Sequence, residues 1–331
     1  RRTVFEHFII LKMKTQAENI HLNQKRTVLL ANMGAPDSEK EMKVFLKRMF
    51  NDKAILYAPD IVRAFASTFI SNVRYKSSWK KYQLIGGSPL QNSMDKTAAD
   101  LEQLLGADYA VSSVYSYSAP FLFDVVSELY AQGIRYFEIM SMYPQASYST
   151  TGSVQASLDQ LKAKFHDIQF RFIEDYYDHP LFIDYWTQLI AEKIRQKNYS
   201  NPYILFSSHA IPQSFIKRGD TYAQKMEKSA KLIAGALNLS YGLGYQSKIG
   251  PIEWTRPYTI DLLNELHSKG IEELIVVPLS FVNENLETRF DLDTELIPYA
   301  KNKLKIKKIC RVEIPASDAT LVKMFKGFIQ K

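Results

Sequence analysis

The chain has 331 residues, of which 46% are hydrophobic and 13% aromatic, whereas a disordered protein would show few apolar residues and an excess of charge. The net charge of +7 suggests an anionic ligand or lipid surface, but apart from the basic run 301–308 the Lys and Arg residues are dispersed. No zinc-finger, RNP or basic-zipper pattern accompanies them, so we predict no nucleic-acid binding.

A single cysteine, Cys310, excludes an internal disulfide, a cysteine zinc site and an all-cysteine iron–sulfur cluster. This cysteine usage favours a reducing, cytoplasmic compartment. No apolar stretch reaches the roughly 18 residues that a membrane span needs. The apolar opening of the chain is interrupted by Glu6 and His7 and lacks a cleavage site, so it is no signal peptide. Residues 1–25 are expected to form a poorly ordered N-terminal extension.

From residue 26 onward, short apolar runs alternate with amphipathic stretches. The apolar runs predict strands at 27–31, 109–115, 136–142, 168–172, 203–206, 244–246, 274–278 and 306–309. The amphipathic stretches predict helices at 39–49, 95–105, 122–132, 153–165, 181–196, 220–237, 258–269 and 316–329. Such alternation is typical of parallel sheets with helices on both faces.

The fold class is therefore α/β, with two Rossmann-like domains, each a parallel four-stranded sheet flanked by helices. We expect the first domain at 26–165, with a projecting segment at 51–82, the second at 166–315 and a C-terminal helix at 316–331. Ligands of such sheets bind beyond the carboxyl ends of the strands. Neither GxGxxG nor GxxxxGK[ST] occurs in the sequence, which argues against a nucleotide site.

His209 lies just after a predicted strand, between Ser208 and Ala210. A lone histidine is more often a structural hydrogen-bonding residue than a functional one. At the carboxyl end of a strand, however, a neutral imidazole could accept a proton or bind a divalent metal ion.

Three carboxylates, Glu287, Asp291 and Glu295, recur at intervals of four residues and would share one face of a helix. The pattern alone leaves two interpretations of equal weight, a solvated acidic face or a track that carries protons or a cation. Glu284 and Asp293 are close in sequence. His209 and these carboxylates would converge on one cleft, where a set without cysteine suits transient binding of a divalent metal.

The segment 51–82 contains a helical pattern with apolar residues at Ile61, Val62, Phe65, Phe69, Ile70 and Val73. From the pattern, an ordinary core helix is the favoured interpretation. The alternative is an exposed apolar lip that contacts a membrane and admits an apolar, acidic ligand.

Six groups of residues, in order along the chain from about 27 to 325, together resemble the ferrochelatase family. They are Asn32-Met-Gly-Ala-Pro36; Ile85-Gly-Gly-Ser-Pro-Leu90; Tyr143-Pro-Gln145 with Ser149-Thr-Thr-Gly152; Ser207-Ser-His-Ala-Ile-Pro212 with Arg218-Gly-Asp220; Tyr245-Gln-Ser-Lys-Ile-Gly-Pro251 with Trp254; and Phe281-Val with Leu286-Glu-Thr288. The resemblance implies a porphyrin cleft between two Rossmann-like domains. It also implies a lyase that inserts ferrous iron into protoporphyrin IX, the last step of haem biosynthesis.

The resemblance also assigns roles. His209 matches the central base and metal ligand, and Glu287 matches the glutamate that pairs with it across the ring. Asp291, Glu295 and Glu284 would form the proton or metal track. The residues that would bind the porphyrin are Met33, Arg74, Tyr82, Ser88, Tyr117, Trp254 and Phe281, with Arg74 and Ser88 at the propionates. The lip at 51–82 would contact the inner face of the membrane. Iron enters as substrate, no cofactor is expected to be tightly bound, and a monomer is expected.

Two positions depart from the family pattern. Asn285 replaces a histidine that many members have before the xET motif, and Ser116 replaces an arginine that would face a propionate. Two alternatives stay open: a coproporphyrin III ferrochelatase, which the loss of the arginine disfavours, and a porphyrin- or haem-binding relative without turnover, which Asn285 suggests.

Overall fold

The computed structural model describes residues 25–331, which form two four-stranded sheets. All strand pairs in both sheets are parallel, which confirms the predicted fold class. Of the expected extension at 1–25, only Lys25 is among the described residues.

The first sheet has the strand order β2-β1-β3-β4. The strands are β1 (Arg26–Asn32), β2 (Tyr109–Tyr115), β3 (Tyr136–Ser141) and β4 (Gln169–Ile173). Alternate β1 residues contribute to two separate cores, Val28 to one and Leu29 to the other, as expected for a central strand covered on both faces. One core includes residues of helix α5 (Leu90–Leu105), and the other includes residues of α6 (Leu122–Ala131) and α7 (Thr151–Lys164).

The boundary predicted between residues 165 and 166 is wrong. Strand β4 pairs in parallel with β3, from Tyr136 opposite Gln169 to Met140 opposite Ile173, and so completes the first sheet. The first domain therefore extends at least through Ile173. The sequence offered no marker for this boundary, because strand and helix alternate in the same way on both sides of it.

The second sheet has the order β6-β5-β7-β8. Its strands are β5 (Tyr203–His209), β6 (Tyr241–Gln246), β7 (Glu273–Val277) and β8 (Lys308–Arg311). Its helices are α8 (Pro180–Lys197), α9 (Gln213–Lys217), α10 (Tyr222–Leu237), α11 (Thr259–Ser268), the π-helix η1 (Glu287–Leu296) and α12 (Ile297–Asn302). Residues of α8 and α10 join the large core that also contains residues of the first domain, whereas residues of α11, η1 and α12 form a core on the opposite face.

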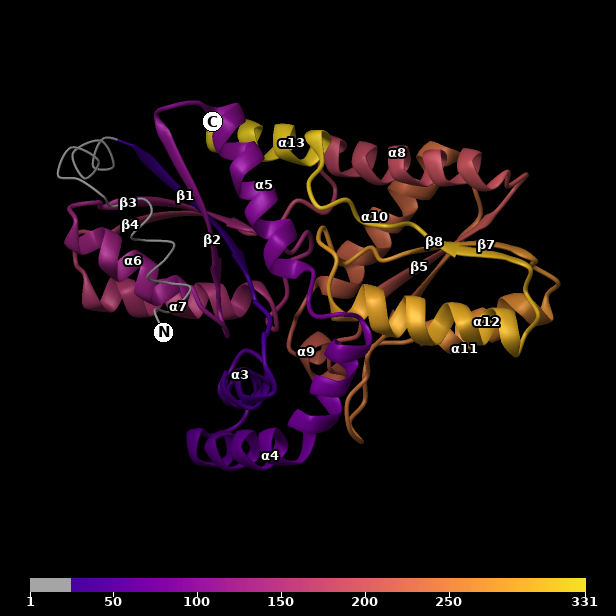
Figure 1. Ribbon diagram of the computed structural model, residues 1–331, viewed down its shortest axis with the longest axis horizontal. Helices are drawn as coiled ribbons and strands as arrows, with labels where there is room; N and C mark the ends of the chain where they lie inside the picture. Colours follow the sequence, from indigo (N-terminus) through magenta and orange to yellow (C-terminus); the bar gives the residue numbers. More distant parts are fainter. Residues whose placement is uncertain (1–24) are drawn as a thin grey trace.

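Helix α13 (Ala319–Ile329) connects the two domains. It contacts both α5 and α8 and lies between them in Figure 1. Asp318 caps its N-terminus by accepting hydrogen bonds from the backbone amides of Thr320 and Leu321. Phe325 is fully buried and meets Tyr176 edge-on. The C-terminal helix is thus part of the shared core.

Helix α3 (Glu39–Asn51) packs against the long helix α4 (Asp60–Leu84), which lies at the outer edge of the molecule (Figure 1). Three α4 residues are buried, Ser67, Ser71 and Tyr82. Ile70 is partly buried against the core, but most of the apolar residues of the predicted pattern face outward, with Ile61 86% and Phe65 75% exposed. The core-helix interpretation favoured for this segment is therefore wrong, and the helix is an exposed apolar lip. None of the helices at residues 25–331 is both long and apolar enough to cross a membrane.

Candidate active site

Two adjoining hollows lie where the carboxyl ends of both sheets meet α3 and α4. The apolar hollow is lined mainly by apolar residues that follow β1 and β7 or lie on α3. The carboxylate hollow is lined by His209, Glu287, Asp291 and Glu295, with residues that follow β6. Glu287 lines both hollows and so marks their junction.

His209 is the last residue of β5, and its backbone is fixed on both sides. Its N–H donates to Ser280 Oγ at 3.1 Å, and its carbonyl accepts from the Tyr222 hydroxyl at 2.9 Å. Burial lowers the pKa of the imidazole, and the nearby Asp291 carboxylate offsets part of this effect. The neutral ring therefore dominates at pH 7 and can accept a proton or bind a metal ion.

The π-helix begins with a reciprocal cap. The Asn285 N–H donates to Thr288 Oγ1 and the Thr288 N–H donates to Asn285 Oδ1, both at 3.0 Å, as in a capping box. Further along, Thr294 Oγ1 donates to the Arg289 carbonyl, five residues back, at 3.0 Å. Asn285, suspected above of a lost proton-carrying role, thus has a structural role at the start of this helix.

The spacing that predicted one carboxylate face holds in this wider helix, because a step of four residues is still close to one turn. Glu287, Asp291 and Glu295 all line the carboxylate hollow. Burial and the charge of Asp291 raise the pKa of Glu287 to about 7. At neutral pH this carboxyl exchanges protons readily, as a proton carrier requires.

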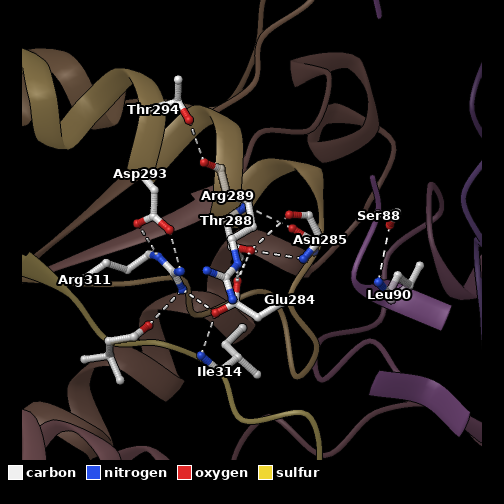
Figure 2. A network of polar contacts seen from close by, with 11 residues as sticks. Ser88, Leu90, Glu284, Asn285, Thr288, Arg289, Asp293, Thr294, Arg311 and Ile314 are labelled. Atoms are coloured by element: carbon white, nitrogen blue, oxygen red, sulfur yellow. Dashed lines mark hydrogen bonds and ion pairs between the residues drawn. The ribbon is translucent and has the colours of Figure 1, made fainter. Parts of the chain in front are cut away.

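Glu284 has a different role from the one predicted for it. It is 4% exposed and is absent from the lining of both hollows. Its Oε1 accepts from Arg311 Nη1 at 2.8 Å and from the Ile314 amide at 2.9 Å, while Oε2 accepts from the Thr288 hydroxyl (Figure 2). The prediction that Glu284 belongs to the track is wrong, because it precedes the helix and is directed toward β8.

Arg311 connects this network to the π-helix. Its Nε and Nη2 donate to the two carboxylate oxygens of Asp293 at 2.8 and 2.7 Å. The Arg311 side chain is 2% exposed, so the two carboxylates satisfy a cation that has lost its contact with water. The sequence placed Asp293 close to the three carboxylates of the track. It gave no sign that Asp293 pairs with Arg311, which lies on β8.

Five of the seven residues predicted to bind the porphyrin line the apolar hollow, namely Met33, Arg74, Tyr82, Ser88 and Phe281. Burial lowers the pKa of Arg74, and no ion pair of its guanidinium exists within residues 25–331. Ser88 Oγ accepts from the Leu90 amide at 3.3 Å (Figure 2). A half-buried cation in an apolar wall that pairs with no carboxylate of residues 25–331 is suited to an anionic substituent of an apolar ligand.

The turn after β1 requires Gly34. Its φ of +86° lies in the left-handed region, and a Cβ there would come within 2.0 Å of Ser118 Oγ. That hydroxyl accepts from the Ala35 amide at 3.2 Å. The glycine therefore lets the chain pass close to Ser118 and brings Met33 to the wall of the hollow.

Tyr117 and Trp254 do not line either hollow, so their place at the porphyrin stays a prediction. Tyr117 is buried behind Phe45, and its hydroxyl donates to Asp52 Oδ2 at 2.8 Å. Trp254 Nε1 donates to the Ile249 carbonyl at 3.0 Å and so holds a loop that contributes Ile249 to both hollows.

Two residues of the carboxylate hollow were not predicted as site residues. Ser247 follows β6 and donates its hydroxyl to Asp291 Oδ2, and Lys81 Nζ on α4 lies 3.8 Å from Asp291 Oδ1. The position of Ser247 just after a strand was a usable signal. Lys81 lies in the other domain, and no local pattern could pair it with Asp291.

Within the described part of the chain, no three His, Cys, Asp or Glu side chains come close enough together to form a closed metal site. The hollow thus lacks the geometry of a structural metal centre, which holds four ligands. It places one imidazole and three carboxylates along a common wall. Such a wall suits a divalent ion that is passed on and not retained.

Comparison with known proteins identifies the family of this chain. The family model for ferrochelatase matches residues 25–331. The ferrochelatase of Aquifex aeolicus is 35% identical over 275 residues, which cover 82% of this chain and 88% of that protein. The ferrochelatase of Geotalea uraniireducens is 34% identical over 286 residues, covering 84% and 89%.

The chain belongs to the ferrochelatase family.

Membership of the ferrochelatase family supports metal insertion into a porphyrin in haem biosynthesis as the type of reaction, and a metal chelatase as the type of enzyme. The fold is also that of solved chelatases. SirB from Bacillus subtilis with Fe³⁺ aligns with a TM-score of 0.55 at 9% identity, over 92% of this chain and 94% of that one. CbiX, the terminal enzyme of siroheme biosynthesis in denitrifying bacteria, aligns with a TM-score of 0.55 at 12% identity, over 92% and 98%.

Removing the buried cation should destabilise this ferrochelatase-family protein. We expect Arg311→Met to lower the free energy of unfolding by about 3–5 kcal/mol, because it leaves the buried Glu284 with only its ion pair to the more exposed Arg289 and removes the ion pair of Asp293. Urea unfolding at pH 7 measures this. The matched control is Arg289→Met, whose side chain is 45% exposed and should cost less than about 1 kcal/mol. Equal losses in the two variants would contradict the role given to Arg311.

The raised pKa of Glu287 also predicts a pH effect on stability. The folded protein holds this proton more tightly than the unfolded chain, so the contribution of Glu287 falls as pH rises from about 4.5 to about 7. Glu287→Gln removes the effect. The gain in free energy of unfolding of this variant over the native protein should therefore be larger at pH 8 than at pH 5, by up to about 3 kcal/mol. Urea unfolding of both proteins at the two pH values measures it. An identical pH dependence would show that the carboxyl is not buried.

Proposed function

We propose that the protein inserts ferrous iron into protoporphyrin IX to form protohaem, the terminal step of haem biosynthesis. The observation that carries the proposal is the position of Glu287 at the junction of the apolar and carboxylate hollows. A porphyrin in the apolar hollow and an iron ion in the carboxylate hollow would meet at this carboxyl. Iron is a substrate here, and the proposed reaction needs no tightly bound cofactor.

The chemistry requires two protons to leave the pyrrole nitrogens as the metal ion enters, and hydrated iron must shed water. The neutral imidazole of His209 has one free nitrogen lone pair, which would bind the metal ion first and accept one proton once the ion has moved to the porphyrin. Glu287, with a pKa of about 7, would accept the other and return to its ionised form by passing the proton on. Asp291 and Glu295 extend from it along the wall of the hollow, and their oxygens could replace water ligands of the iron.

The walls of the apolar hollow support the less acidic of the two candidate porphyrins. Arg74 is the one basic side chain among the described residues that line it. Protoporphyrin IX carries two carboxylates and coproporphyrin III carries four, so the second would place more charge against apolar walls. Tyr82 and Tyr143 also line the hollow, and burial together with the charge of Glu287 raises the pKa of both phenols.

Anaerobic insertion assays test the proposal. The purified protein is given ferrous iron with protoporphyrin IX or with coproporphyrin III, and loss of the free-porphyrin absorption bands is followed. We expect faster turnover of protoporphyrin IX. His209→Ala and Glu287→Gln should each lower kcat by at least about 100-fold, because each removes a proton acceptor. Porphyrin should still quench intrinsic fluorescence in the Glu287→Gln variant.

Each contrary result has a defined meaning. Faster turnover of coproporphyrin III would assign the protein to that substrate. Tight porphyrin binding without any turnover would identify a binding protein. Normal turnover of Glu287→Gln would show that another carboxylate takes the proton.

We further propose that the protein works as a monomer in the cytoplasm and that the α4 lip contacts the inner face of the membrane. Ile61, Phe65, Phe69 and Val73 recur every four residues on α4 and are each more than 60% exposed. A contiguous exposed apolar stripe is typical of helices that bury one face in lipid. Arg74, the next residue along the helix, lines both hollows, so a greasy porphyrin could pass from lipid into the site.

Vesicle co-sedimentation tests this contact. The double variant Phe65→Ser/Phe69→Ser should bind vesicles at least about tenfold more weakly than the native protein, because two large apolar side chains no longer enter lipid. Asn72→Ser, at another exposed position of the same helix, should bind as the native protein does. Equal binding of all three proteins would contradict lipid contact through this stripe.

A further inference from the structure

Lys81 is a basic residue of the carboxylate hollow that the proposed reaction does not use. It lies in the last turn of α4, and its ammonium is 3.8 Å from Asp291 Oδ1 and 4.4 Å from the centre of the Phe290 ring. The second oxygen of Asp291 accepts from the Ser247 hydroxyl. Asp291 is thus bound on both sides, by a cation from the first domain and a hydroxyl from the second.

Two of the other basic side chains in or beside the π-helix form ion pairs with carboxylates outside the track. Arg289 forms an ion pair with Glu284, and Arg311 forms ion pairs with Glu284 and Asp293. Over residues 25–331, Lys81 is the one basic side chain in an ion pair with Glu287, Asp291 or Glu295. Arg74 and Lys248 also line the carboxylate hollow, but within residues 25–331 only Lys81, from the lip, forms an ion pair with a carboxylate of the track.

Unlike the buried guanidinium of Arg311, the Lys81 ammonium can move away from its carboxylate partner into water. The Lys81 side chain is 42% exposed and its partner Asp291 is 18% exposed. At such exposure an ion pair is weak, and a lysine has a flexible stem that can return the ammonium to water. A divalent ion that reaches Asp291 would repel the ammonium across a few ångströms.

We propose that Lys81 occupies the cation position of the carboxylate track in the metal-free protein and that an incoming divalent ion must displace it. This inference rests on the proposed function, in which the track delivers the metal ion. Lys81 then weakens metal binding at Asp291, so that an ion is passed to the porphyrin and is not retained in the track. It is a positioning residue that sets metal affinity through Asp291.

The test is a gain of metal affinity. Zn²⁺ binding to porphyrin-free protein is measured by competition with a chromophoric chelator at fixed pH and low salt. Lys81→Met should bind Zn²⁺ about tenfold more tightly than the native protein, because a repelling charge beside the site is gone, and the gain should shrink in high salt. In the anaerobic insertion assay, the KM for ferrous iron should fall while the KM for porphyrin stays the same.

Three controls make the result specific. Lys81→Arg keeps the charge and should retain native Zn²⁺ affinity. Lys80→Met removes an exposed positive charge one residue away and should also leave it unchanged. The gain should disappear when Lys81→Met is combined with Asp291→Asn, which separates this site from any other that binds Zn²⁺.

Equal or weaker Zn²⁺ binding by Lys81→Met would overturn the inference, and so would an equal gain in Lys80→Met. Failure of the proposed function would look different. If the native protein inserts no iron into either porphyrin, the enzyme proposal fails, while the Zn²⁺ measurements need no turnover and still decide whether Lys81 competes for the track.

Discussion

The arrangement of the site depends on one buried cation. Arg311 at the end of β8 binds Glu284, which precedes the π-helix, and Asp293 within that helix. Glu284 also accepts a hydrogen bond from the amide of Ile314, so the segment after β7 and the segment after β8 are joined. A guanidinium removed from water keeps these partners because losing either would leave a charge unpaired. The π-helix is thereby held with Glu287 between the two hollows.

Carboxylates within and just before the π-helix are of two kinds, and their surroundings account for the difference. Glu284 and Asp293 accept hydrogen bonds from Arg311 and help to hold the helix in place. Glu287 lies in the wall of the hollow, where burial and the charge of Asp291 raise its pKa to about 7. Removal from water disfavours a charged carboxylate at both Glu284 and Glu287. The guanidinium of Arg311 stabilises the charge of Glu284, whereas Glu287 loses its charge by binding a proton.

The hollows exist because two separate sheets present their carboxyl ends to the same space. The turn after β1 supplies Met33 and Gly34, the end of β5 supplies His209, and the segment after β7 supplies Phe281 and Glu287. Helix α13 packs against α5 and α8 and so joins the domains on another side (Figure 1). Helix α4 adds Arg74 and Lys81 to the hollows while its apolar stripe faces outward.

Period and spacing determined the fold class and singled out candidate site residues, because they depend on neighbours in the chain. The roles expected of those candidates came from the family resemblance. Strand–helix alternation predicted two parallel sheets, the end of a strand indicated His209, and the four-residue interval placed three carboxylates on one face. The tertiary structure decided what depends on partners far away in the sequence. It assigned β4 to the first sheet, turned the apolar face of α4 outward, withdrew Tyr117 and Trp254 from the cavity wall, and paired Glu284 with Arg311 and Asp291 with Lys81. Local patterns cannot specify such pairs, because the free energy of a buried charge or an exposed apolar side chain depends on which distant residues pack around it.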